Sequence, residues 1–270
     1  MDRYAVIGNP IAHSLSPEIH ARFGVQQRDL VEYRALLAPL DAFRATALAF
    51  FDSGALGANV TLPFKVEAFE LADHASDRAR AAGAANVLSM RDGRIEADNT
   101  DGAGLVVDLA HNLGYRLRGA RILLLGAGGA ARGVIAPLLE AGAARITVAN
   151  RNGARARELA RRFTPSNVAG CALGDAASES HDLVLNATSA STHGEPLALP
   201  PGVLESASLA YDMAYGAAAG SFLAAARAAG AQASDGLGML VEQAAESFLL
   251  WRRKRPDTAP VLEALRARFA

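Results

Sequence analysis

Short apolar runs alternate along this chain with longer segments in which apolar residues recur every three or four positions. A short apolar run bounded by turn residues is typical of a buried strand, and the longer spacing is typical of an amphipathic helix. Residues 4–7 form the first such run, and a helical pattern follows from Ser16. This regular alternation predicts an α/β fold with largely parallel sheets.

Turn and cap residues mark several ends of these elements. Ser16 followed by Pro17 is a common helix start, so we expect Ser16 at the N-cap and Pro17 at the first helical position. Asp92-Gly93 indicates a β-hairpin, and Pro63 suits the first turn of a helix. The elements expected up to residue 101 are strands at 4–7, 31–36, 58–62, 86–90 and 94–97, and helices from 16 and at 39–54.

A second series of predicted helices and strands begins after Asp101. It starts with a helix that Gly114 ends, and residues 121–151 then read as strand, glycine-rich turn, helix and strand. We therefore predict two lobes, which divide after residue 101. Further expected elements are strands at 182–186 and 208–212 and helices at 221–229, 239–251 and 259–269.

The composition narrows the class of protein. The chain has 270 residues, of which 51% are apolar and 20% charged, so it can bury the cores of two domains. A formal net charge of −1 gives no sign of a basic surface for nucleic acid or an anionic membrane. The single cysteine, Cys171, excludes an internal disulfide and fits a reducing compartment.

Membrane segments and leaders are not expected either. No run approaches the roughly 18 uninterrupted apolar residues of a membrane span, and the first apolar run is too short for a secretory signal. These features predict a soluble, cytoplasmic protein without a nucleic-acid or membrane partner.

A glycine-rich motif follows the buried strand at 122–125 directly. Gly126, Gly128 and Ala131 give G-x-G-x-x-A, in which the first glycine makes a tight turn and the second admits a pyrophosphate. Amides at the following helix start favour the anion. A purely structural turn is the alternative. The residues expected to bind a dinucleotide here are Gly126, Ala127, Gly128, Gly129 and Ala130.

The end of the next strand discriminates between NAD and NADP. An NAD site usually has an acidic residue about 20 residues past the motif, which accepts from the ribose hydroxyls. Here the strand ends in Asn150, Arg151 and Asn152, with Arg155 a helical turn later. No carboxylate is present to repel a 2′-phosphate, and the two arginines can clamp it. We therefore predict NADP, with solvated arginines as the alternative.

Polar residues also follow strands in the first lobe, where α/β proteins bind ligands. Hydride transfer to a carbonyl needs a proton donor near the oxygen. Lys65 is a candidate donor, although a solvated lysine at the end of a strand is the alternative. Other polar candidates are Ser14 and Ser16 in the first loop and Asn59 and Thr61 beside Lys65.

Taken in order, these motifs resemble those of one family, the shikimate dehydrogenases. The resemblance covers essentially the whole chain, and so many ordered motifs are far more specific than any one of them. The matching segments are GNPIAHSLSP at 8–17, GANVTLPFK at 57–65, Asn86, DNTDG at 98–102, GAGGAARG at 126–133, Asn150-Arg151, NATS at 186–189, YDMAY at 211–215 and DGLGMLVEQAA at 235–245.

The resemblance implies reversible NADPH-dependent reduction of 3-dehydroshikimate to shikimate, in the biosynthesis of chorismate and aromatic amino acids. It also implies the domains: an N-terminal α/β substrate-binding domain, 1–101, joined by the C-terminal helices of 236–270, and a Rossmann NADP-binding domain, 102–235. Periodicity alone does not place those last helices on the first lobe.

Two alternatives remain on the same fold. A quinate/shikimate dehydrogenase would be expected to have an acidic residue at Asn150-Arg151, and a non-catalytic NADP-binding regulatory paralogue would be expected to lack Lys65 or Asp101. The oligomeric state stays open, with a homodimer as one alternative, and no metal is expected.

The resemblance also assigns roles residue by residue. Lys65 and Asp101 correspond to the catalytic pair, and Ser14 and Ser16 to the residues that hold the substrate carboxylate. Asn152 replaces the usual threonine, and its amide can still donate to a phosphate. Asn59, Thr61, Asn86 and Gln243 correspond to residues that reach ring hydroxyls, Tyr215 borders the substrate, Met213 and Gly236 line the nicotinamide side, and Asp77 falls near the cofactor.

Overall fold

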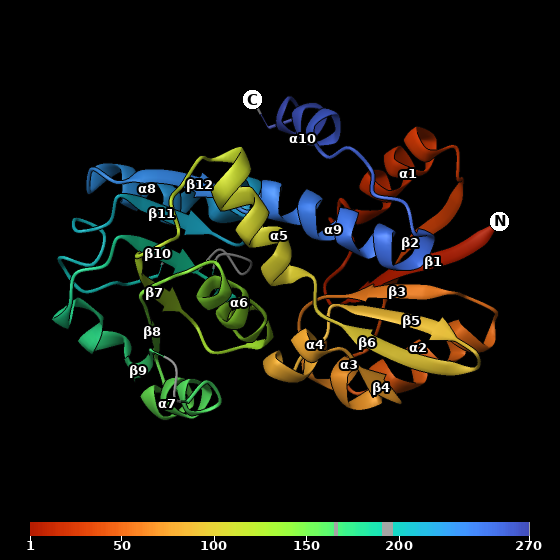
Figure 1. Ribbon diagram of the computed structural model, residues 1–270, viewed down its shortest axis with the longest axis horizontal. Helices are drawn as coiled ribbons and strands as arrows, with labels where there is room; N and C mark the ends of the chain where they lie inside the picture. The colour runs from red at the N-terminus through yellow and green to blue at the C-terminus, as the bar shows by residue number, and fades with distance from the viewer. Residues whose placement is uncertain (165–166, 191–196, 270) are drawn as a thin grey trace. The chain divides into compact units, whose positions relative to one another are not determined.

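The computed structural model describes residues 1–164, 167–190 and 197–269. The chain divides into two compact units (Figure 1). Unit 1 comprises Met1–Gly104 and Leu240–Ala270, and unit 2 comprises Leu105–Met239. Both are α/β, which confirms the predicted fold class.

Unit 1 is built on a six-stranded sheet of order β2-β1-β3-β5-β6-β4. β1 pairs in parallel with β2 and β3, whereas β3–β5 and β5–β6 are antiparallel, so this sheet is mixed. The predicted hairpin is confirmed, because β5 and β6 join through Asp92 and Gly93, both at positive φ. The strands are β1 Asp2–Gly8, β2 Val31–Leu37, β3 Gly57–Val60, β4 His74–Ala75, β5 Val87–Arg91 and β6 Arg94–Asp98.

Alternating side chains give this sheet two different packed faces. Ala5 and Ile7 of β1 belong to the apolar core beneath α2 and α3. Tyr4, on the opposite face, stacks on Trp251 of α9 with ring centroids 4.7 Å apart. The helices wholly in this unit are α1 Ser16–Gln27, α2 Phe43–Asp52, α3 Lys65–Leu71, α4 Asp77–Ala82 and α10 Ala259–Arg266. α5 Asp101–Val107 begins in unit 1 and ends in unit 2, and α9 Leu237–Arg252 begins in unit 2 and ends in unit 1.

Three helix starts differ from the sequence-based expectation. Leu15, not Ser16, is the N-cap of α1; the Ser14 hydroxyl accepts from the Ser16 N–H at 3.3 Å, so the predicted Ser16 cap is wrong. α2 begins at Phe43 rather than at 39. Pro63 precedes α3 instead of lying in its first turn, because a turn closed by the Phe64 N–H on the Thr61 carbonyl comes first.

Unit 2 contains an all-parallel six-stranded sheet of order β12-β11-β10-β7-β8-β9. α6 and α7 contribute to the core on one face of this sheet, and α8 contributes to the core on the other (Figure 1). Burial on both faces explains why β7 reads as an uninterrupted apolar run. The strands and the α-helices wholly in this unit are β7 Arg121–Leu125, α6 Gly129–Glu140, β8 Arg145–Asn150, α7 Gly153–Arg161, β9 Val168–Ala172, β10 Leu183–Asn186, β11 Leu209–Asp212, α8 Gly220–Ala228 and β12 Gln232–Asp235.

Candidate active site

A buried ion pair lies in unit 1 where the resemblance placed its catalytic residues. Nζ of Lys65, the first residue of α3, donates to Oδ2 of Asp101, the first residue of α5, at 2.5 Å. Lys65 is 9% and Asp101 4% exposed. A solvated lysine at the end of a strand, the alternative reading, does not describe this environment.

Asn86, just before β5, joins this pair to α9. Its Nδ2 lies 2.9 Å from Oδ1 of Asp101 and 3.1 Å from Oε1 of Gln243. Its Oδ1 accepts from the Thr100 N–H at 2.7 Å. The structure therefore brings together four predicted site residues, Lys65, Asn86, Asp101 and Gln243, from four separate segments of the chain.

Asn59 of β3 belongs to the same hydrogen-bonded cluster. Its Nδ2 donates to the Ser247 hydroxyl at 2.9 Å and to the Asn86 carbonyl at 3.2 Å, and its Oδ1 accepts from the Tyr33 hydroxyl at 2.7 Å. Both amide hydrogens are thus used within the protein. Toward a ligand, Asn59 retains acceptor capacity only.

Two loops follow the carboxyl ends of β1 and β3. Ser14 lies in the first loop, Ser16 begins α1 directly after it, and Thr61 lies in the second loop. Ser14 and Thr61 are half-buried and Ser16 is buried. The two loops are joined by backbone bonds, since the Thr61 N–H donates to Ile7 and the Asn9 N–H donates to Leu62. The predicted carboxylate-binding serines are therefore held at the same edge of the sheet as Asn59.

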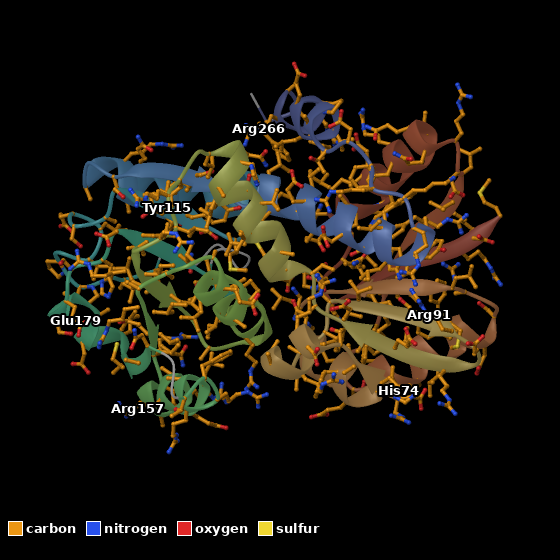
Figure 2. All side chains as sticks on the ribbon, viewed as in Figure 1. His74, Arg91, Tyr115, Arg157, Glu179 and Arg266 are labelled. Carbon is orange, nitrogen blue, oxygen red and sulfur yellow. The ribbon has the colours of Figure 1, made fainter. Side chains whose placement is uncertain are left out.

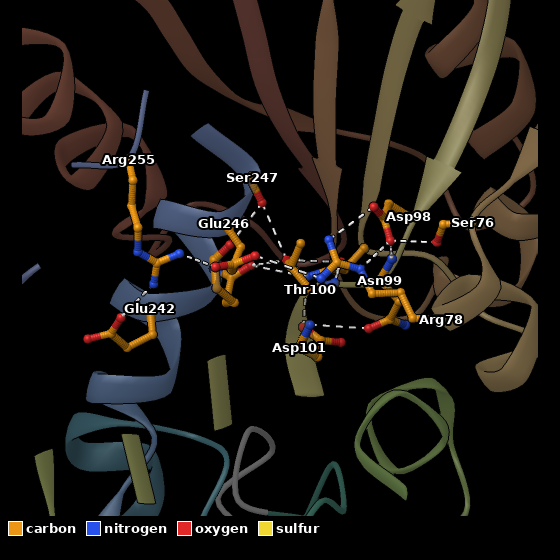
Figure 3. A network of polar contacts seen from close by, with 12 residues as sticks. Ser76, Arg78, Asp98, Asn99, Thr100, Asp101, Glu242, Glu246, Ser247 and Arg255 are labelled. Atoms are coloured by element: carbon orange, nitrogen blue, oxygen red, sulfur yellow. Dashed lines mark hydrogen bonds and ion pairs between the residues drawn. The ribbon is translucent and has the colours of Figure 1, made fainter. Parts of the chain in front are cut away.

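A salt-bridge network anchors the loop before Asp101 to α9 (Figure 3). Arg78 donates through Nε to Oδ1 of Asp98 at 2.5 Å, and its Nη1 lies 3.7 Å from Glu246 of α9. Burial acts to raise the pKa of Asp98, but hydrogen bonds from Arg78 and Ser76 outweigh it and lower that pKa. The Asp98–Asp101 loop and α9, which carries Gln243, are thereby held by one network.

The predicted dinucleotide turn in unit 2 has the geometry of its motif. Gly126 adopts φ +103°, and a Cβ there would lie 3.0 Å from the Ala187 carbonyl oxygen, so glycine is required. Gly128 is the N-cap of the twelve-residue helix α6, and nothing lies within 4 Å of a Cβ built on it. Ala131 is fully buried. An open helix N-terminus of this kind accommodates an anion.

The residues predicted to select NADP lie at the end of β8 and the start of α7. Asn152 caps α7 by accepting from the Ala154 N–H at 3.0 Å, which leaves its amide hydrogens for a ligand. Arg151 and Arg155 are exposed, and neither has an ion-pair partner among the described residues. Arg157 of the same helix lies at the outer surface of unit 2 (Figure 2).

The remaining predicted residues occupy several places. In unit 2, Gly236 and Met213 are in contact, because a Cβ on Gly236 would lie 2.5 Å from the Met213 carbonyl oxygen. Tyr215 follows β11 in the same unit and is half-buried. Asp77 begins α4 in unit 1, and its exposed carboxylate pairs with Arg80 at 2.6 Å.

Several polar residues of the site were not predicted as such. Thr100 and Ser247 are fully buried and contact Asn86 and Asn59, and Tyr33 contacts Asn59. A signal was present for Ser247, which lies one helical turn after Gln243 on the buried side of α9. Tyr33 gave none, because a tyrosine in an edge strand is ordinary.

Comparisons with known proteins agree with this geometry. Residues 6–88 match the family described as shikimate dehydrogenase substrate binding domain, 108–194 match shikimate / quinate 5-dehydrogenase, and 236–266 match shikimate 5'-dehydrogenase C-terminal domain. The chain is 56% identical to the shikimate dehydrogenase (NADP(+)) of Aromatoleum aromaticum, over 98% of this chain and 97% of that protein.

Solved structures share the fold over their whole length. An Ael1 enzyme from Pseudomonas putida is 48% identical with a TM-score of 0.90, and each chain is covered to 98%. A Thermus thermophilus shikimate 5-dehydrogenase, solved in complex with NADP(H) and shikimate, is 35% identical with a TM-score of 0.85, and each chain is covered to 99%. With these matches over its whole length, the chain belongs to the shikimate dehydrogenase family.

Proposed function

We propose that this protein catalyses the reversible NADPH-dependent reduction of 3-dehydroshikimate to shikimate, a step in the biosynthesis of chorismate and aromatic amino acids. Family membership supports the reaction. The observation that carries the proposal is the buried contact of 2.5 Å between Lys65 Nζ and Asp101 Oδ2, with Asn86 bound to the second carboxylate oxygen. A non-catalytic paralogue has no need to keep such a pair.

Lys65 and Asp101 act in this proposal as the proton-transfer unit. Asp101 orients the ammonium, and Nζ of Lys65 gives a proton to the ketone oxygen as its negative charge develops. In the oxidation direction the pair accepts the hydroxyl proton.

The other polar residues of unit 1 bind the substrate in this proposal. Ser14 and Ser16 hold the carboxylate through hydroxyl donors. Thr61, Asn86 and Gln243 hold ring hydroxyls, and Asn59 contributes an acceptor, since its amide hydrogens are used internally. Tyr215 borders the ring.

The residues of unit 2 fit an NADP molecule. Bound NADPH supplies the hydride. The open N-terminus of α6, with Gly126, Ala127, Gly128, Gly129 and Ala130, receives the pyrophosphate. Arg151 and Arg155 pair with the 2′-phosphate. Asn150 and Asn152 contact the cofactor at the same end of β8. Met213 and Gly236 line the nicotinamide side. From unit 1, Asp77 is proposed to lie near the cofactor.

Domain extent, location and assembly are proposed as well. The substrate domain is 1–101 with 236–270, and the NADP domain is 102–235. We place the enzyme in the cytoplasm, because its single cysteine needs no oxidising compartment. No helix within the described ranges is long and apolar enough to cross a membrane. A homodimer stays a prediction, which analytical ultracentrifugation tests by measuring the molar mass in solution.

The proposal is tested by assaying the purified protein for shikimate oxidation with NADP at alkaline pH, with quinate and NAD as controls. We expect shikimate with NADP to be the preferred pair. Preference for quinate with NAD would favour the quinate/shikimate alternative. No activity with either pair would favour a regulatory role.

A further inference from the structure

Asn59 depends on its neighbours for the orientation of its carboxamide. In the observed orientation, Nδ2 faces two acceptors, the Ser247 hydroxyl oxygen and the Asn86 carbonyl oxygen, and Oδ1 faces the Tyr33 hydroxyl. The Ser247 hydroxyl already donates to the Gln243 carbonyl at 2.9 Å. A flipped carboxamide would set Oδ1 against the Asn86 carbonyl oxygen and leave the Ser247 oxygen without its donor.

The Tyr33 hydroxyl, on β2, donates to Oδ1 of Asn59 and so favours the observed orientation of the carboxamide. Burial of its hydroxyl raises the pKa of Tyr33 well above its ordinary value, and the neighbouring Ser16 hydroxyl acts in the opposite direction. Tyr33 is therefore a neutral phenol that donates to Oδ1 of Asn59. It also lies between two proposed substrate-binding residues, Ser16 and Asn59.

The imidazole of His20, on α1, stacks against one face of the Tyr33 ring. The two rings are nearly parallel, with centroids 4.2 Å apart and planes 6° apart. His20 is 1% exposed, and neither of its ring nitrogens has a hydrogen-bond partner in the described chain. Its other ring neighbours are Phe23, Phe248 and Trp251.

The chemistry of His20 suits a stacking role. Burial lowers its pKa from 6.5 to about 3, and Asn59 is the polar group that acts against this shift. The imidazole is therefore neutral, and it fills the space behind Tyr33 without an ionic partner. An aromatic ring of this kind restricts the tilt of Tyr33, and with it the direction of the phenol hydroxyl.

We propose that Tyr33 and His20 are positioning residues that hold the Asn59 carboxamide with its free acceptor toward a hydroxyl of the substrate. This inference rests on the proposed shikimate activity and adds residues to it. Neither side chain needs to touch the substrate. Tyr33 acts through Asn59, and His20 acts through Tyr33.

A double-mutant cycle between Tyr33→Phe and Asn59→Ala tests the first link. Tyr33→Phe keeps the ring and its stack but removes the donor, so we expect the KM for shikimate to rise about tenfold, as for one lost hydrogen bond, with kcat changed by less than about threefold. In the Asn59→Ala background the same change should have no further effect on KM, because the residue through which it acts is gone.

Tyr4→Phe is the matched control. Tyr4 is the register partner of Tyr33 on β1, and its hydroxyl lies 3.3 Å from Nη1 of Arg252 rather than near Asn59. It should leave KM unchanged. Ser247→Ala, which removes the other side-chain anchor of Asn59, gives a second cycle with Asn59→Ala, and the same coupling is expected there.

Two substitutions at His20 test the second link. His20→Phe keeps a ring behind Tyr33 and should keep KM within about twofold, whereas His20→Ala should raise KM toward the Tyr33→Phe value. The fluorescence of Trp251, the only tryptophan, monitors folding in every variant.

The possible results separate the inference from the proposed function. A wild-type enzyme inactive toward shikimate contradicts the function itself. An active wild type whose KM is unaffected by Tyr33→Phe, or whose Tyr33→Phe and Asn59→Ala effects simply multiply, overturns the role of Tyr33. A His20→Ala enzyme with wild-type KM overturns the role of His20.

Discussion

At the scale of single residues, Asp101 shows why the proposed catalytic pair holds together. Oδ2 receives Lys65, Oδ1 receives Asn86, and the backbone N–H of Asp101 donates to Oδ1 of Asn99 at 3.2 Å. A buried ion pair is stable only when further hydrogen bonds satisfy it, and loss of one partner leaves an uncompensated charge. Lys65→Met and Asp101→Asn keep the side-chain volume, so they add no cavity to the cost of the lost charge.

Each of these two substitutions should lower kcat for shikimate oxidation by about 10²–10⁴-fold, the usual contribution of general acid–base catalysis. The double mutant should be little worse than the poorer single mutant, because groups that act as a unit are not additive. NADP affinity, measured by titration, should stay near wild type. Losses that multiply would indicate two independent roles, and a Lys65→Met enzyme with wild-type kcat would exclude proton transfer by Lys65.

The sequence was sufficient to nominate Lys65 and Asp101, because both lie in recognisable motifs. It was insufficient for Tyr33 and Ser247, whose contacts with Asn59 depend on strand register and on the packing of α9. Ser16 shows a third case. The Ser-Pro pair predicted a helix start correctly, but the N-cap is Leu15, and the Ser16 N–H donates to the Ser14 hydroxyl. The substrate-binding roles of these residues stay predictions.

At the scale of elements, strand–turn–helix units were predictable where glycine or hairpin chemistry marks them. β7, the Gly126 turn and α6 follow the motif, as do β5 and β6 around Asp92-Gly93. β9 and β12 were missed, since they are short edge strands with the weak sequences VAGCA and QASD. Edge strands gain little from burial, so their composition carries little signal.

The turn before α6 allows a prediction about cofactor affinity. Gly128→Ala should leave the melting temperature unchanged, because φ there is −86° and a Cβ meets nothing within 4 Å. The same methyl group would crowd a pyrophosphate, so the Kd for NADP and that for NAD should both rise at least about tenfold. Gly174→Ala, also in open space, is the control. Unchanged cofactor binding in Gly128→Ala would place the pyrophosphate elsewhere.

The β8–α7 junction makes a second prediction, which concerns cofactor choice. Replacing Arg151 and Arg155 by alanine removes charge-assisted hydrogen bonds worth about 1.5–3 kcal/mol each. NADP affinity should therefore fall at least about tenfold, while NAD affinity changes little. Arg157→Ala, on the same helix and also exposed, is the matched control. Equal weakening of both cofactors in calorimetric titration would contradict the assignment of the 2′-phosphate site.

At the scale of the whole molecule, the chain leaves unit 1 and returns to it. Periodicity predicted α9 and α10 but not their place. They belong to unit 1 because Trp251 stacks on Tyr4, and Arg252 pairs with Asp29 and Asp2. The two arginine contacts join residues 223 and 250 positions apart, which no local pattern encodes. Only the family resemblance pointed to this return.

The same unit gives a prediction about global stability and pH. Burial among the rings of Tyr33, Phe23, Phe248 and Trp251 lowers the pKa of His20 from 6.5 to about 3, and no charged group contributes to that shift in the described chain. Between these two pKa values the unfolded chain binds one more proton than the native protein. The free energy of unfolding therefore rises with pH in this window, and the stability is lost as pH falls below about 6.5.

From pH 7 to pH 5, this single group should cost about 2 kcal/mol of unfolding free energy, at about 1.4 kcal/mol per pH unit below 6.5. His20→Phe keeps the ring but cannot be protonated, so its stability should fall less over the same range. His13→Phe is the control, because the exposed His13 ring has no such packing.

Urea denaturation at several pH values, followed by Trp251 fluorescence, measures the difference in unfolding free energy between wild type and each variant. Carboxylates such as Asp98 and Asp182, whose pKa values are also lowered, affect wild type and variants alike and cancel in that difference. If wild type and His20→Phe lose stability in parallel down to pH 5, His20 is not the buried neutral ring that the structure describes.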